Sequence, residues 1–125
     1  MKVKVTPSKV HGNVKIPASK SMAHRALICA SLSDGTSLVS NVTNSKDIEA
    51  TVGCMKALGA IIKQIDETTY EVTGTNLFKQ EGNITCNANE SGSTLRFLIP
   101  LAACTNAKVK FLGQGRLLQR PMDVY

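Results

Sequence analysis

The chain has 125 residues, of which 42% are hydrophobic and 4% aromatic, and its net charge is +6. This length allows one domain with a modest, mainly aliphatic core, and the hydrophobic share excludes an intrinsically disordered chain. The basic excess is compatible with anionic partners and equally with an ordinary basic surface. The Lys and Arg residues are spread along the chain and aromatic residues are few, which favours small anions over nucleic acid.

The first part of the chain alternates between polar and apolar residues, so residues 2–5 and 10–16 are predicted to form strands. Apolar residues then recur at helical spacing, which predicts a helix over residues 19–32. A short strand is predicted to follow over residues 36–42.

The middle of the chain predicts a second helix, which begins at Asn44 and Ser45 and ends at Gly59. Further strands are predicted over residues 60–65, 69–72 and 84–86. A third helix is then predicted over residues 91–104 and a strand over residues 108–112, and Pro121 is predicted to begin another helix.

These elements contain an internal repeat. A shift of 71 residues lays Arg25 on Arg96 and Leu27 on Leu98, and it also aligns the strand that follows each helix. The unit reads β-α-β-α-β-β, with unit one over about residues 9–75 and an incomplete unit two over about residues 82–125. Because the second unit stops one turn into a helix, we expect the chain to be part of a longer protein.

The cysteines argue against a metal or redox site. The four are Cys29, Cys54, Cys86 and Cys104, and no two form a CxxC pair or join a His cluster. Each lies in an apolar stretch, where a free thiol behaves as a small hydrophobic group. With no signal peptide and no apolar run long enough to span a membrane, the expected location is the cytoplasm.

Two helix starts carry groups that bind anions. The first places Ser19, Lys20 and Ser21 at a helix N-terminus, with Arg25 one turn later. Backbone N–H groups, hydroxyls and cations at such a terminus suit a phosphate or carboxylate. Spacing alone is equally compatible with an ordinary capped helix whose charges are solvated.

The second helix start repeats the arrangement one unit later. Gly92 and Ser93 open this helix, Arg96 follows on it, and glycine allows a ligand to approach the backbone closely. A third candidate group is Arg120, which stands directly before Pro121. Because the same arrangement occurs twice at the repeat spacing, an ordinary cap becomes a weaker explanation for both.

These motifs resemble the family of shikimate-pathway enolpyruvyl transferases, the 3-phosphoshikimate 1-carboxyvinyltransferases. Residues 17–27, P-A-S-K-S-M-A-H-R-A-L, resemble the family's first signature, P-x-S-K-S-x-x-x-R-A-L. Residues 44–48 with 55–59, residues 91–98 and residues 115–122 resemble three further signatures in the family's order. The resemblance covers nearly the whole chain but only about the first third of the family's usual length.

The resemblance implies an α/β (α+β) fold of repeated β-α-β-α-β-β units in an inside-out barrel, here nearly two of the three units of one domain. Residues 1–125 would be a partial N-terminal substrate-binding domain, and the strand at residues 2–5 would be free to join the second domain. The implied reaction transfers the enolpyruvyl group of phosphoenolpyruvate to the 5-hydroxyl of shikimate 3-phosphate and releases phosphate. It uses no cofactor and no metal.

By motif match, Lys20 would lie between the two substrates as the catalytic residue, stabilising charge in the transition state. Shikimate 3-phosphate would bind Lys20, Ser21 and Arg25. Phosphoenolpyruvate would bind Lys20, Gly92, Ser93 and Arg120. Arg96 would support the second loop.

The resemblance also sets expectations for the whole molecule. The family's acid–base carboxylates lie beyond Tyr125, so we expect no turnover and weak substrate affinity from this chain alone. The intact enzyme is expected to be a monomer without nucleic-acid or membrane partners. Helix faces meant to be covered by a third unit would expose apolar surface, so self-association of the fragment is a hypothesis.

Two departures from the family pattern and two alternatives stay open. Phe97 stands where many members carry Pro, and Glu90 where many carry Asn. The first alternative is a UDP-N-acetylglucosamine enolpyruvyl transferase, but Lys20-Ser21 stands where that family typically has Lys-Asn. The second is a basic nucleic-acid-binding module, which salt-dependent RNA binding would support.

Overall fold

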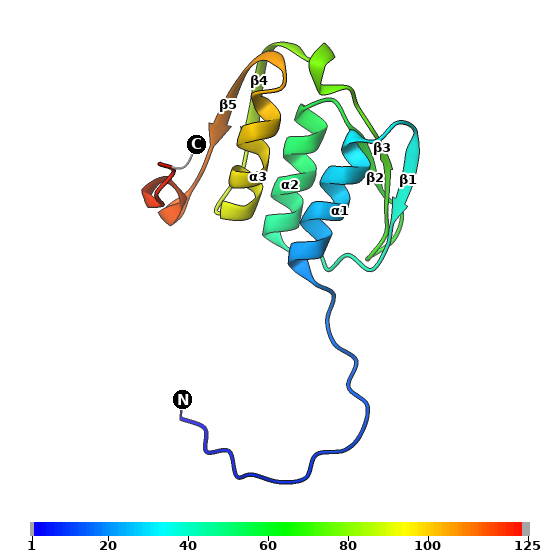
Figure 1. Cartoon of the computed structure of the whole chain (residues 1–125), viewed down its shortest axis with the longest axis vertical. Helices are drawn as coiled ribbons and strands as arrows, with labels where there is room; N and C mark the ends of the chain where they lie inside the picture. The colour runs from blue at the N-terminus through cyan, green and yellow to red at the C-terminus, as the bar shows by residue number, and fades with distance from the viewer. Residues whose placement is uncertain (1, 124–125) are drawn as a thin grey trace.

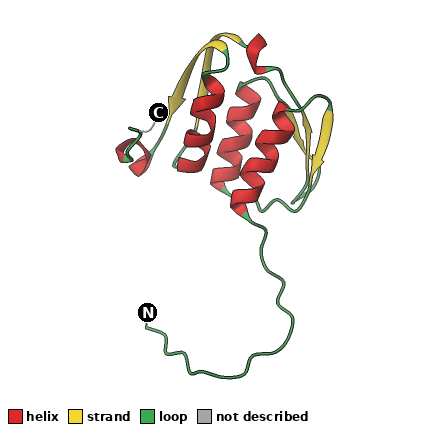
Figure 2. Ribbon diagram, viewed as in Figure 1, coloured by secondary structure: helices red, strands yellow, loops and turns green. Residues whose placement is uncertain are grey.

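The computed structural model describes residues 2–123. Three helices lie side by side, with a three-stranded sheet beside α1 and a two-stranded sheet beside α3 (Figures 1 and 2). The N-terminal residues leave this body as an extended tail (Figure 1). The folded part therefore begins at the first helix.

Each of the three helices begins at a serine cap. They are α1 (Lys20–Leu32), α2 (Lys46–Ala57) and α3 (Gly92–Ala102). The hydroxyls of Ser19, Ser45 and Ser91 accept hydrogen bonds from the backbone N–H three residues later, at 3.3, 3.3 and 3.2 Å. Such a cap satisfies an N–H that has no partner inside the helix, so the three predicted helices are confirmed together with the reason for their starts.

Two sheets flank the helices. The first is antiparallel in the order β1-β3-β2, built from β1 (Thr36–Val39), β2 (Ile61–Gln64) and β3 (Tyr70–Thr73). The second pairs β4 (Glu81–Asn87) in parallel with β5 (Asn106–Leu112). The crossover between β4 and β5 is α3, as a parallel connection requires. Two short 3-10 turns, η1 (Leu77–Lys79) and η2 (Gly115–Gln119), complete the described elements.

The order of elements agrees with the predicted repeat in part. In both halves a capped helix is followed by a strand, α1 by β1 and α3 by β5. The strand that precedes the helix is present only in the second half, as β4. The division of the chain into units, with boundaries near residues 9–75 and 82–125, remains a prediction.

Two strand predictions were wrong. Residues 2–5 and 10–16 form no strand, and their Val and Ile side chains are 70–92% exposed. Alternation shows that a segment could be half-buried, but these residues have neither a partner strand nor an apolar surface in the described chain. The helix predicted from Pro121 is also not formed over residues 121–123, and residues 124–125 lie outside the described part.

The core is mainly aliphatic, as expected. Most of its largest fully buried apolar side chains lie on the three helices, on β3 or directly after α2, and they include Leu27, Ile48, Met55, Leu58, Val72 and Leu98. Cys54 and Cys86 are buried in it, and the pKa of the Cys54 thiol is raised by its hydrogen bond with Cys86 and by burial. Cys29 and Cys104 are exposed.

No helix among residues 2–123 has the length and hydropathy needed to cross a membrane.

Candidate functional site

The N-termini of the three helices lie at one end of the folded body, on the side from which the tail leaves it (Figure 1). Each helix start carries partial positive charge from N–H groups that have no intrahelical partner. Three such ends side by side make a surface suited to anions. The site residues expected from the sequence lie on two of these starts and on the segment that follows η2.

Lys20 is the first residue of α1, and its ammonium contacts the first turn of α2. Its Nζ lies 2.8 Å from Asp47 Oδ2, and the two side chains are 54% and 35% exposed. An ion pair this exposed contributes about 0–1 kcal/mol, so an anionic ligand can compete with Asp47 for the lysine. Asp47 therefore holds Lys20 at the site without burying it.

Ser21 and Arg25 share the exposed face of α1. The Arg25 Nη1 donates to the backbone oxygen of Ser21 at 2.9 Å, one turn earlier. The guanidinium also lies 5.1 Å from the centre of the Phe97 ring on α3, a cation–π contact. Phe97, a departure from the family pattern, thus orients Arg25 and joins α1 to α3 across α2.

Gly92 opens α3 against Arg120. A side chain at Gly92 would collide with the Nη1 atom of Arg120, so the absence of a Cβ lets the guanidinium lie directly over the first turn. Ser93 follows, with an exposed side chain. The backbone N–H groups of Gly92 and Ser93 belong to the first turn, where no intrahelical acceptor is available.

Arg96 supports the segment that carries Arg120. Its Nη2 donates to the backbone oxygen of Pro121 at 3.4 Å. Arg120 itself follows η2 and is exposed, and its backbone N–H donates to Leu117 at 3.1 Å. The contact between α3 and residues 120–121 is therefore made from both sides, by Gly92 and by Arg96.

The structure brings the expected residues into two groups on one end of the molecule. Gly92, Arg96 and Arg120 form one group, and Lys20 belongs to the other through α1. Asp47 connects them, because its carboxylate contacts Lys20 while its backbone oxygen lies 3.3 Å from the Thr94 hydroxyl on α3. From the sequence, no role was assigned to Asp47 and this contact was not predicted.

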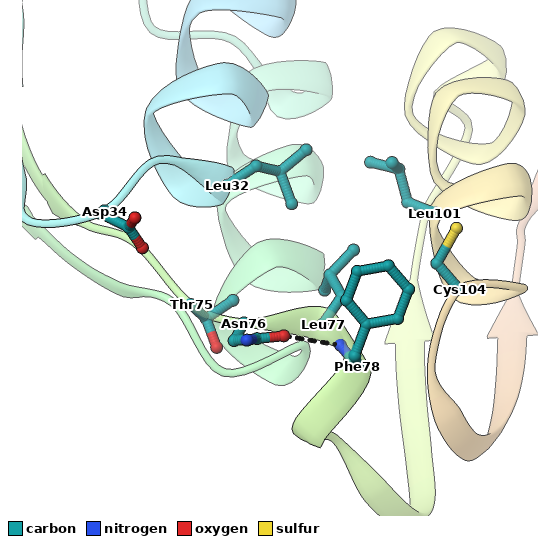
Figure 3. Close-up of a pocket in the computed structure, with 8 residues that line it drawn as sticks. All are labelled: Leu32, Asp34, Thr75, Asn76, Leu77, Phe78, Leu101 and Cys104. Carbon is teal, nitrogen blue, oxygen red and sulfur yellow. Dashed lines mark hydrogen bonds between the residues drawn. The ribbon is translucent and has the colours of Figure 1, made fainter.

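A pocket at the opposite end of the helices differs from the candidate site in the chemistry of its lining. It measures about 360 Å³, and Figure 3 shows it between the C-terminal ends of α1 and α3 and the η1 turn. Its lining is mainly apolar with one charged side chain, Asp34, and consists of Leu32, Asp34, Thr75, Asn76, Leu77, Phe78, Leu101 and Cys104. This lining includes no lysine or arginine, so it suits an anion poorly.

Within the described range, residues 2–123, no group of three or more His, Cys, Asp or Glu side chains is placed to hold a metal ion.

Comparison with protein families gives a match over residues 4–125 to the family described as EPSP synthase (3-phosphoshikimate 1-carboxyvinyltransferase). A curated relative named 3-phosphoshikimate 1-carboxyvinyltransferase, from Clostridium perfringens (strain SM101 / Type A), is 52% identical over 124 residues, covering 99% of this chain and 29% of the relative. A relative of the same name from Clostridioides difficile (strain 630) is 47% identical, covering 98% and 30%. The chain thus spans under a third of these relatives.

Solved structures agree on the fold. Two structures of EPSP synthase from Acinetobacter baumannii align with TM-scores of 0.74 and 0.78, at 21% and 20% identity. Each alignment covers 90% of this chain and about a quarter of the other, 26% and 25%. The predicted α/β fold class is confirmed.

Proposed function

The chain belongs to the EPSP synthase family, and we propose that it supplies part of the active site of a longer transferase. That enzyme would move the enolpyruvyl group of phosphoenolpyruvate to the 5-hydroxyl of shikimate 3-phosphate. One observation carries the proposal: the three helix N-termini lie at the same end of the folded body, and Lys20, Gly92 and Arg120 are located there.

Both substrates are anions, and the groups at this end are those that bind anions. Arg25 and Ser21 would bind shikimate 3-phosphate, and Gly92, Ser93 and Arg120 would bind phosphoenolpyruvate. The guanidinium over Gly92 and the first-turn N–H groups offer charge-assisted hydrogen bonds to a carboxylate or phosphate. Arg96 would hold residues 120–121 in place through Pro121.

Lys20 would be the catalytic residue of this part. In the addition step the 5-hydroxyl gives up its proton to a base, its oxygen bonds to C2 of phosphoenolpyruvate, and a proton is added to C3 as the C2–C3 double bond becomes single. In the elimination step C3 loses a proton, the C2–O bond to phosphate breaks, and inorganic phosphate leaves. The Lys20 ammonium between the substrates would stabilise the negative charge that develops on them in the transition state. To do so, Lys20 would give up its ion pair with Asp47 and contact the ligand instead.

The part of the longer enzyme that this chain does not include would supply the groups that transfer protons. This chain alone would therefore not catalyse the reaction. We also propose a cytoplasmic protein that acts without metal or organic cofactor and without nucleic acid, and an intact enzyme that is a monomer. Self-association of the isolated chain stays a prediction that light scattering would test.

The test is a chimera in which this chain replaces the matched stretch of the Clostridium perfringens relative, with phosphate release as the measurement. We expect an active chimera. Lys20→Ala should lower kcat by at least about 100-fold, and Arg25→Ala should raise KM for shikimate 3-phosphate about tenfold.

The matched control is Lys63→Ala. Lys63 is also an exposed lysine near a carboxylate, at 3.8 Å from Glu71, but it lies on the sheet. We expect this variant to keep the activity of the parent chimera. A folded chimera that releases no phosphate, or one that uses UDP-N-acetylglucosamine in place of shikimate 3-phosphate, would contradict the proposal.

A further inference from the structure

A chain of buried hydrogen bonds crosses all three helices beneath the candidate site. His24 Nδ1 on α1 lies 2.7 Å from Thr51 Oγ1 on α2, and Thr51 Oγ1 lies 2.7 Å from Thr94 Oγ1 on α3. Thr94 Oγ1 in turn lies 2.7 Å from the Oγ of its own helix cap, Ser91. The four side chains are at most 3% exposed, so these bonds are formed away from water.

Burying polar groups at this depth destabilises the fold unless every polar hydrogen has an acceptor. The other ring nitrogen of His24, Nε2, is buried and has no hydrogen-bond partner among residues 2–123. A hydrogen on Nε2 would leave a buried donor unsatisfied, which is rarer in proteins than an unsatisfied acceptor. A hydrogen on Nδ1 instead donates to Thr51 and leaves only a lone pair without a partner.

With the hydrogen on Nδ1, every hydrogen bond in this series donates in the same direction, from α1 toward α3. A hydroxyl has a single hydrogen, so Thr51 accepts from His24 and donates to Thr94. Thr94 then donates to Ser91 Oγ or to the Asp47 backbone oxygen at 3.3 Å. The imidazole therefore stands at the donor end and the first turns of α2 and α3 at the acceptor end.

The acceptor end coincides with the candidate site. Thr94 directly follows Gly92 and Ser93 in the first turn of α3, and its backbone N–H is capped by Ser91. Asp47, whose backbone oxygen Thr94 contacts, holds Lys20 with its carboxylate. The same few bonds thus join the lysine on α1 to the first-turn N–H groups on α3.

We propose that His24, Thr51 and Thr94 are positioning residues, and that their buried hydrogen-bond chain sets the first turn of α3 at a fixed distance from Lys20. The inference rests on the proposed function, because it concerns the same site. None of the three residues needs to touch a substrate. Their effect passes through Gly92, Ser93 and Lys20.

The kinetic test compares Thr51→Val with Thr51→Ser in the Clostridium perfringens chimera. Valine keeps the shape of threonine and removes the hydroxyl, whereas serine keeps the hydroxyl. Displacing catalytic groups by a fraction of an ångström lowers the rate, so we expect Thr51→Val to lower kcat at least about tenfold with a smaller change in KM. Thr51→Ser should restore most of kcat.

The control is Thr36→Val, which removes an exposed hydroxyl paired with Thr73 at 2.9 Å on the sheet. It should leave kcat unchanged. Rates are compared per folded molecule, so a loss of stability alone does not count as support. Equal kcat for Thr51→Val and the parent would overturn the inference, while an inactive folded parent would instead overturn the proposed function.

A second measurement does not depend on activity or on any variant. The chain has two histidines, His24 and His11, and His11 in the exposed tail provides a reference imidazole signal. Long-range ¹H–¹⁵N spectra of the chain distinguish a hydrogen on Nδ1 from one on Nε2. We expect His24 to carry its hydrogen on Nδ1, and a hydrogen on Nε2 would overturn the inference.

Discussion

Gly92 is the residue at which the site leaves no space for a side chain. Gly92→Ala would push the Arg120 guanidinium away from the first turn of α3, but that group ends a flexible, exposed side chain and can shift. We expect the fold to remain, with stability changed by no more than about 1 kcal/mol. In the chimera, KM for phosphoenolpyruvate should rise several-fold.

Gly53→Ala is the matched control for this change. Gly53 lies within α2, and an added Cβ there meets nothing within 4 Å. Alanine should stabilise the helix by up to about 1 kcal/mol and leave KM unchanged. If both alanine variants bind phosphoenolpyruvate equally well, then Arg120 is not a ligand for it.

His24 makes stability depend on pH. Burial lowers its pKa below the ordinary 6.5, Asp47 opposes this shift, and Lys20 and Arg25 add to it. The unfolded state binds the proton more readily than the folded state. The contribution of neutral His24 to the free energy of unfolding is therefore fully present well above pH 6.5 and decreases as pH falls below 6.5. Urea unfolding of the chain at a series of pH values measures this decrease.

His24→Gln removes the titrating group, and its unfolding free energy should vary less over the same pH range. If that variant does not fold, an NMR titration of His24 in the unchanged chain gives the same information. A His24 pKa at or above the ordinary value would contradict the buried, neutral imidazole.

At the scale of elements, the helices were predictable because their signals are local. Ser19, Ser45 and Ser91 each cap a helix within three residues of the group that they bind. The strand at residues 10–16 has equally clear alternation, yet it does not form. A strand needs a partner, and alternation carries no information about whether one is present.

The site shows the same division. The sequence placed Lys20 and Gly92 at helix starts, which is correct. It did not pair Lys20 with Asp47, because 27 residues separate them and only the packing of α1 against α2 brings them together. His24 and Thr51 are also 27 residues apart, so their bond depends on the same packing.

The tail and the first cap make a contrasting pair at this scale. Removing residues 2–17 deletes exposed side chains and no described element, so we expect the free energy of unfolding to change by less than about 0.5 kcal/mol. Ser19→Ala leaves the tail and removes the α1 cap, at a cost of about 1 kcal/mol. Urea unfolding measures both, and a large loss from the deletion would show that the tail packs on the folded part.

At the scale of the whole molecule, charge and helix orientation act together. The chain carries a net charge of +6, and three helix dipoles direct their positive ends at the same surface. This surface attracts anions without a closed pocket around them, because Lys20, Arg25 and Arg120 are all exposed. An exposed site is screened by salt and desolvates a ligand poorly.

We therefore expect the isolated chain to bind shikimate 3-phosphate weakly, with Kd on the order of 1 mM, which corresponds to a binding free energy of about −4 kcal/mol. In an amide NMR titration, shifts should concentrate at Ser21, Arg25 and Gly92 and diminish as salt is added. The double variant Lys20→Ala, Arg25→Ala should lose them. Well-dispersed peaks that do not shift would mean that this end binds only when the rest of the protein closes over it, whereas shifts around Leu32 and Leu101 would assign the ligand to the pocket at the opposite end of the helices.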